Sequence, residues 1–162
     1  ACLASYNNGK LHGAWIDADQ SPEAIHEEIQ VMLKSSPEPM AEEWAIHDYE
    51  GFGSIRLSEW ESIEHVADLA AFINEHGKLG LALLAHFCGD LNEARPALED
   101  NYCGEFRSLS EFAQQITEET TVIPKNLSYY IDYEAMARDM EYSGDVFTVE
   151  TGYEEVHVFW NH

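Results

Sequence analysis

The stretch IDYEAMARDMEY (131–142) governs how the C-terminal part of the chain is interpreted. Projected as a helix, at about 100° per residue, it places Tyr133, Met136, Ala137 and Met140 on one side. A continuous apolar side of this kind packs in a core or against a partner. The stretch is therefore predicted to be an amphipathic helix.

The acidic residues of this stretch do not converge on one point. Asp132 and Asp139 fall on one flank of the apolar stripe, and Glu134 and Glu141 fall on the other. The members of each pair lie about 10 Å apart along the axis. Two carboxylates that share a metal or act as acid and base must approach one reacting atom within several ångströms. These four are predicted to form a solvated polar surface.

The segments around this helix predict an α+β C-terminal part. SLSEFAQQITEE (108–119) carries Ser108 and Glu111 at capping-box spacing and is predicted to be a helix. DVFTVE (145–150) and VHVFW (156–160) are predicted to pair as strands across the turn TGYEE.

The N-terminal part combines predicted strands with one helix. ACLASY (1–6) and GAWIDA (13–18) are separated by NNGK, whose Asn-Gly is a hairpin signal, and WAIHDYEGFG (44–53) is a third predicted strand. Between them, Ser21 caps a predicted helix whose apolar residues recur at helical spacing until SSPEP (35–39).

The middle of the chain is predicted to be helical. One helix is expected over 62–75, ending at His76-Gly77, and two shorter ones around 79–88 and 92–101. The fold class is therefore α+β, built from three small domains in series. These are an N-terminal domain with β-sheet plus helix (1–59), a central helical domain (60–103), and a C-terminal domain with helix plus β-hairpin or sheet (104–162).

Acidity is the outstanding property of the composition. The 162 residues include 31 Asp and Glu against 8 Lys and Arg, which gives a net charge of −23. Apolar residues make up 45% of the chain, enough for a core, so the charge does not indicate disorder. The excess is spread along the chain and forms no acidic tail.

Catalytic and cofactor motifs receive little support. Glu23 and His26 have the Glu-x-x-His spacing of carboxylate-bridged metal sites, but HExxH is absent and one copy on a helix is weak. His86 and Cys88 lie in an apolar run where a thiol usually fills a core. No nucleotide-binding glycine pattern is present, and we expect no cofactor and no enzymatic activity, although a metal enzyme stays an open alternative.

The cysteines and the apolar runs favour a soluble protein. Three cysteines form no CxxC pair, which fits a reducing cytoplasm. The longest apolar run, residues 79–88, is too short to span a bilayer, so no membrane partner is expected. No signal peptide is recognised at the N-terminal end.

Nucleic acid would be repelled by this chain, because binding to phosphates needs Lys and Arg. The converse is that a basic groove built for DNA should attract an extended body with distributed carboxylates. The net charge equals that of about 12 base pairs, at one charge per ~1.7 Å of duplex. Proteins from salt-rich habitats and acidic partners of other basic proteins have similar totals, so charge alone leaves these alternatives open.

Several segments resemble the ArdA family of antirestriction proteins. IDYEAMARDM (131–140) is similar to the family's antirestriction motif, and YNNGKLHGAWIDA (6–18), HDYEGF (47–52), GEFRSLSEFAQQITEE (104–119) and VHVFW (156–160) resemble family segments in the same order.

The resemblance implies a non-enzymatic inhibitor of type I restriction-modification enzymes, acting in the cytoplasm and encoded on mobile genetic elements. It implies an elongated chain of three small domains that imitates B-form DNA and dimerises. The motif is associated with the dimer contact, here Tyr130, Asp132, Tyr133, Glu134, Ala135, Met136, Ala137, Arg138, Asp139 and Met140. The alternative is an acidic adaptor of another basic DNA-associated protein, such as a nucleoid or CRISPR component.

The acidic surface that would imitate DNA is predicted from residues in all three domains. Its members are Asp17, Asp19, Glu23, Glu27, Glu28, Glu42, Glu43, Asp48, Glu50, Glu59, Glu61, Glu64, Asp68, Glu99, Asp100, Glu111, Glu118 and Glu119.

Overall fold

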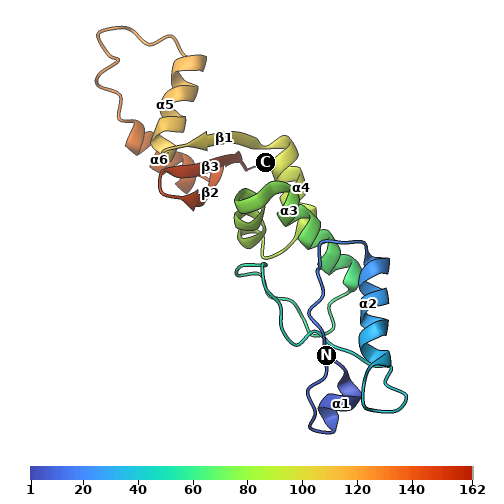
Figure 1. Cartoon of the computed structure of the whole chain (residues 1–162). Helices are drawn as coiled ribbons and strands as arrows, with labels where there is room; N and C mark the ends of the chain where they lie inside the picture. The colour runs from blue at the N-terminus through green and yellow to red at the C-terminus, as the bar shows by residue number, and fades with distance from the viewer. Residues whose placement is uncertain (162) are drawn as a thin grey trace. The chain divides into compact units, whose positions relative to one another are not determined.

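The computed structural model describes residues 1–161, and the chain divides into two compact units, Ala1–Leu81 and the residues from Ala82 onward. The fold is α+β, as predicted. Along the described residues the elements are α1 (Leu3–Asn7), α2 (Pro22–Lys34), α3 (Ile63–His86), α4 (Leu91–Asp100), β1 (Tyr102–Phe106), α5 (Leu109–Thr120), α6 (Tyr133–Tyr142), β2 (Val146–Gly152) and β3 (Glu155–Trp160) (Figure 1).

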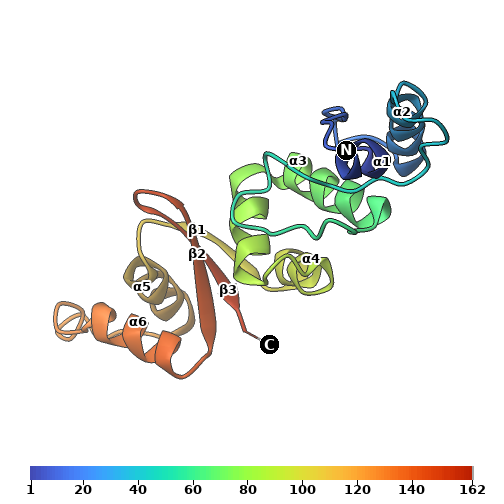
Figure 2. The ribbon, with the colours of Figure 1, turned by 90° about the horizontal axis from the view of Figure 1, so that it is seen from below.

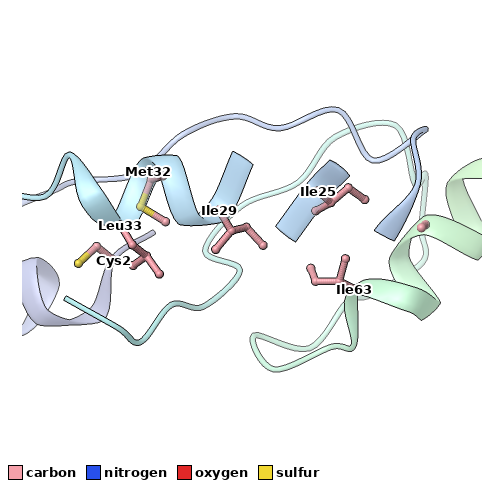
Figure 3. Packing of buried hydrophobic residues seen from close by; sticks show 7 residues of the cluster. Cys2, Ile25, Ile29, Met32, Leu33 and Ile63 are labelled. Atoms are coloured by element: carbon pink, nitrogen blue, oxygen red, sulfur yellow. The ribbon is translucent and has the colours of Figure 1, made fainter. Parts of the chain in front are cut away.

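Helix α2 organises the core of the first unit. The Ser21 hydroxyl caps it by accepting a hydrogen bond from the Ala24 N–H at 3.2 Å. Its buried face contributes Ile25, Ile29, Met32 and Leu33, which pack with Cys2, Ile63 and Ala67. Figure 3 shows Ile63 opposite Ile25, and Cys2 beside Leu33. The predicted helix and its cap are confirmed.

The predicted strand at residues 1–6 is wrong, because this segment contains the short helix α1. The Tyr6 N–H donates to the Cys2 carbonyl at 3.1 Å, and the buried Ser5 hydroxyl hydrogen-bonds the Ser36 hydroxyl at 2.9 Å. Gly9, with φ 75°, makes the turn that the Asn-Gly pair predicted. That turn follows a helix and does not connect two strands.

The predicted strands at 13–18 and 44–53 are also wrong, and with them the N-terminal β-sheet. The first unit contains one isolated antiparallel bridge, Cys2 with Trp44. Residues 1–3 form hydrogen bonds with the residues that directly precede each of these two segments. The Cys2 N–H donates to the His12 carbonyl at 2.8 Å, and the Leu3 N–H donates to the Glu43 carbonyl at 3.0 Å. These backbones lie close together, but too few consecutive hydrogen bonds form to make a ladder.

Helix α3 is interrupted where the sequence predicted an end. Gly77 has φ 59° and ψ −137°, which is not helical and which residues with a Cβ rarely adopt. The segment before it is capped by Ser62, whose hydroxyl accepts from the His65 N–H at 3.1 Å. The segment after it and α4 match the two shorter predicted helices. Pro96 lies inside α4, on its exposed side.

The second unit is built on a three-stranded antiparallel sheet in the order β1-β3-β2. The predicted pairing of β2 with β3 is confirmed, with Phe147 opposite Phe159 and Thr148 opposite Val158. Strand β1 was not predicted and pairs with the other edge of β3. The last strand in sequence is therefore the central strand of the sheet.

Both faces of this sheet are covered. Val146 and Val158 pack with Phe112 of α5, and Met140 of α6 lies against the same cluster. On the other face, Phe147 stacks between Phe159 at 4.9 Å and His86, at the end of α3, at 4.3 Å. Figure 2 shows α5 and α6 together on one side of the strands. The middle of β3 and its partners Val146 and Val149 are thus buried, which explains their apolar residues, whereas Tyr102, Glu105 and Glu150 stay exposed.

Candidate binding surface

The carboxylates of the chain lie almost entirely on the surface. All Asp and Glu side chains are exposed except three, Glu38, Glu61 and Glu155, which are half-buried. Of the residues predicted to form the acidic surface, only Glu61 is not fully exposed. Their role in binding stays a prediction.

Both compact units carry this charge. Residues 1–81 contain 15 Asp and Glu with 4 Lys and Arg, and residues 82–162 contain 16 with 4. The net charges are therefore −11 and −12. The acidity is therefore shared almost equally between the two units.

Few cations neutralise these carboxylates. In residues 1–161, the one Lys or Arg within 4.0 Å of a carboxylate is Lys10, whose Nζ donates to Glu38 Oε1 at 2.8 Å. The hydrogen bond from Lys10 lowers the pKa of Glu38. Arg138 of the predicted motif is exposed and has no such ion pair in this part of the chain. The acidic field is left uncompensated.

Helix α2 shows how the sequence presents charge. Its apolar face is fixed in the core, so Glu23, Glu27 and Glu28 project into solvent. Glu23 and Glu27 are one turn apart, about 6 Å along the axis. The Glu28 carboxylate accepts a hydrogen bond from the Gln20 side chain, which also donates to the Asp17 carbonyl. The loop before the helix is thereby tied to it.

Helix α6 carries the predicted motif, and its apolar side faces the unit's own core. Asp132 caps the helix by accepting from the Ala135 N–H at 2.9 Å. Ala137 is buried, and Met140 packs against the cluster around Phe112. Thr117 of α5 donates to the Met136 sulfur at 3.2 Å. The predicted apolar face is confirmed, whereas its role as a dimer contact stays a prediction.

Exposed aromatic side chains lie around the motif; Tyr130 was predicted as part of it, whereas Tyr129 and Tyr142 were missed by the sequence reasoning. Tyr129 and Tyr130 precede α6 and expose 92% and 83% of their surface, and Tyr142 at its end exposes 87%. An excess of tyrosine at the ends of a predicted surface helix was the available signal. The Tyr133, Ile131 and Asp132 side chains line a shallow hollow of about 420 Å³ with the start of α5.

The histidines considered for metal or nucleophilic chemistry contact other side chains in the structure. No group of three or more His, Cys, Asp and Glu side chains in residues 1–161 is arranged to hold a metal ion. His26 lies 3.6 Å from Glu64, while His86 stacks on Phe147. No helix in the described part of the chain is long and apolar enough to cross a membrane.

His157 is the one buried histidine of the second unit's sheet. The Tyr102 hydroxyl lies 2.7 Å from its Nδ1, and the Thr151 hydroxyl lies 3.0 Å from its Nε2. Burial raises the pKa of Tyr102, and the charge of Glu105 raises it further. Since both ring nitrogens have partners, this histidine is a satisfied part of the core.

A comparison with protein families matches residues 1–155 to the family described as antirestriction protein (ArdA). The chain belongs to the ArdA antirestriction family. A search among curated proteins found no match. ArdA is a family of antirestriction proteins and not of enzymes. Membership of an antirestriction family implies interaction with restriction-modification enzymes. The resemblance seen in the sequence segments is thereby confirmed over residues 1–155, whereas the segment 156–160 lies beyond the match.

Proposed function

We propose that this ArdA protein imitates B-form DNA and inhibits type I restriction-modification enzymes by occupying their DNA-binding groove. The observation that supports this most is the exposed, uncompensated acidity of both units. A groove that binds phosphates is lined with Lys and Arg, and it attracts any surface that presents negative charge at suitable spacing. No catalytic step is involved.

Charge spacing makes this imitation physically reasonable. The carboxylates of Glu23 and Glu27 lie one helical turn apart, about 6 Å along the axis, whereas one DNA strand carries a charge about every 3.4 Å. One helix face thus supplies roughly half the charge density of a strand. Carboxylates from several elements must act together, which is why the proposal rests on the whole set predicted above and not on one cluster.

The arrangement of the chain in the inhibitor is part of the proposal. Three small domains, 1–59, 60–103 and 104–162, would follow the enzyme's groove in series. Two copies would form a homodimer through residues 130–140 and double the acidic surface. The exposed Tyr130 of this stretch and Tyr129 just before it provide aromatic area of the kind found in protein interfaces.

A competition assay tests the proposal. A purified type I methyltransferase core is bound to its labelled DNA target and titrated with this protein at about 50 and about 200 mM salt. We expect displacement of DNA, at least about tenfold weaker at the higher salt because screening weakens charge-driven binding. An equally acidic unrelated protein is the control.

Failure to displace DNA from type I cores of several specificities, at micromolar protein, would refute groove occupation. Binding to such a core without displacement would favour the adaptor alternative, in which the acidic protein docks elsewhere on a basic partner.

A further inference from the structure

The first unit contains an apolar cavity that the charge of the surface does not explain. Its volume is about 970 Å³, near the upper end of the range for pockets that hold small ligands, about 300–1,000 Å³. The floor comes from the core faces of two helices, with Ile25, Ile29 and Met32 of α2 and Ile63 and Val66 of α3. All of its lining residues belong to the first unit.

The walls are two irregular segments, residues 11–19 and 44–52, which hydrogen bonds tie to the neighbouring parts of the unit. The His12 ring nitrogen Nε2 lies 2.7 Å from the Met32 carbonyl at the end of α2. The Ile46 N–H donates to the Glu59 carbonyl at 3.0 Å. Together with the backbone bonds to residues 1–3, these contacts keep the two walls from collapsing onto the floor.

The rim of the cavity combines an exposed indole with carboxylates. Trp15 lines the cavity and exposes 67% of its surface. Asp17, Asp19, Asp48 and Glu50 line the same cavity and are exposed. Among its lining residues there is no Lys or Arg side chain, and its only ionisable bases besides the chain's first amino group are two histidines. The opening is therefore apolar inside and negative at the edge.

From this juxtaposition we propose that the cavity binds a basic segment of a partner protein that carries an apolar side chain next to Arg or Lys. The apolar side chain enters between the two walls and lies on the floor that α2 and α3 form, and the cation lies against Trp15 and the rim carboxylates. An Arg or Lys over an indole gains a cation–π contact as well as charge attraction. A DNA phosphate backbone has no counterpart of the indole or of the apolar cavity, so these two features add to the imitation of DNA, although the four rim carboxylates also belong to the acidic surface predicted from the sequence.

The inference rests on the proposed function only in taking the restriction-modification enzyme as the source of that segment. If the inference holds, part of the binding free energy comes from the cavity of the first unit alone. Distributed charge tolerates the loss of any one group, whereas an apolar anchor in a pocket concentrates binding energy in a few aromatic and apolar contacts. Apolar contact is also unscreened by salt, unlike the acidic surface.

Two blocked octapeptides test the chemistry without the enzyme. One alternates Arg and Leu and the other alternates Arg and Ser, so they carry the same charge. Their affinities are measured by fluorescence anisotropy, and amide shifts in NMR spectra locate the contact. We expect the Arg/Leu peptide to bind at least about tenfold more tightly and to shift residues of the cavity walls. Equal affinities, or shifts outside the cavity, would overturn the proposal.

The chain offers a matched pair of variants. Trp15 and Trp60 expose the same 67% of their surface, but only Trp15 lines the cavity. Trp15→Ala should remove most of the preference for the Arg/Leu peptide, and Trp60→Ala should keep it. Equal behaviour of the two variants would contradict the assignment. Both positions are on the surface, so the comparison does not depend on a core change.

A second pair fills the cavity. Ala70 of α3 lines it, while the neighbouring Ala71 is exposed and lies outside the lining. Ala70→Phe should abolish the preference for the apolar peptide without changing the affinity for the Arg/Ser peptide, and Ala71→Phe should change neither. Retained preference in a folded Ala70→Phe protein would refute the cavity as the site, and the tryptophan pair decides the question if this variant unfolds.

The two proposals fail in different ways. If the protein displaces DNA from the enzyme but shows no peptide preference, the cavity inference is wrong and groove occupation stands. If the peptide preference is present but DNA is not displaced, the proposed function is wrong and the cavity serves another basic partner. If both hold, Trp15→Ala should weaken DNA displacement at least about tenfold while leaving its salt dependence unchanged.

Discussion

Removing carboxylates from α2 tests whether inhibition depends on a distributed acidic field or on one specific contact. Glu27 is exposed in the middle of the helix, one turn after Glu23 and next to Glu28. The first variant is Glu27→Gln, and the second changes Glu23, Glu27 and Glu28 together to Gln. The third is a double variant that combines Glu27→Gln with Gln30→Glu. Gln30 is exposed on the same helix, so the double variant keeps the net charge and moves its position.

The expected magnitudes follow from exposure. An exposed charge pair contributes about 0.2–1 kcal/mol, so Glu27→Gln should weaken DNA displacement by about 1.4- to 5-fold. The triple change should weaken it by about 3- to 150-fold. Stability should move little, because removing Glu27 relieves about 0.2–0.5 kcal/mol of repulsion one turn from Glu23, while removing Glu23 loses a favourable helix-dipole interaction of similar size.

The assay is the DNA competition on the methyltransferase core at low salt, with thermal unfolding followed in parallel. For a distributed field, the double variant should inhibit nearly as well as the unmodified protein. A loss above about 100-fold from Glu27→Gln alone, unrescued by Gln30→Glu, would refute the distributed field and identify a specific contact. An inactive triple variant that is also unfolded would be uninformative, which the thermal measurement detects.

Three further predictions concern local features. Ser21→Ala removes the acceptor for the Ala24 N–H and should destabilise the first unit by about 0.5–2 kcal/mol in urea unfolding; unchanged stability would mean the cap is replaced by water. Glu38 has a lowered pKa, so its pair with Lys10 stabilises the fold above the ordinary carboxyl pKa of 4.5, and this contribution is lost as pH falls through the lowered value. The stability difference between the protein and Lys10→Met should therefore shrink on acidification, and a difference that grew would contradict the pairing. Tyr130→Arg, at an exposed site, should shift sedimentation toward monomer without unfolding, and a dimer that persists at low concentration would exclude this stretch as the contact.

Most helices were predictable because their signals are local. Ser21 and Ser108 cap α2 and α5, and the apolar residues of each helix recur at helical spacing. Hydrogen-bonding residues and periodicity act within one or two turns, so sequence alone locates such elements. The Glu111 carboxylate accepts from the Arg107 N–H at 2.6 Å, one residue before the Ser108 N–H to which a capping box would direct it.

The strands depended on contacts that sequence does not contain. Residues 1–6 alternate too weakly to exclude a helical turn, and the Ser5 contact with Ser36 that holds it joins residues far apart in the chain. Strand β1 is short and contains Gly104, with φ 123°, so its propensity is low and only pairing with β3 creates it.

The candidate site was predictable in kind and not in detail. Exposure of carboxylates follows from their chemistry, so the acidic surface could be named residue by residue. The cavity beside Trp15 could not, because it arises where two irregular segments meet the faces of α2 and α3.

The central place of β3 sets an order of events during protein synthesis. Strands β1 and β2 each pair with β3 and not with each other, yet β3 comes after both in the chain. While a ribosome is still adding residues 155–160, neither partner has a strand to pair with, and the aromatic and valine side chains of the sheet have no buried layer to join. The second unit is thus expected to wait unfolded on the ribosome until its final segment emerges, while the first unit, whose core residues all precede it, is free to fold earlier.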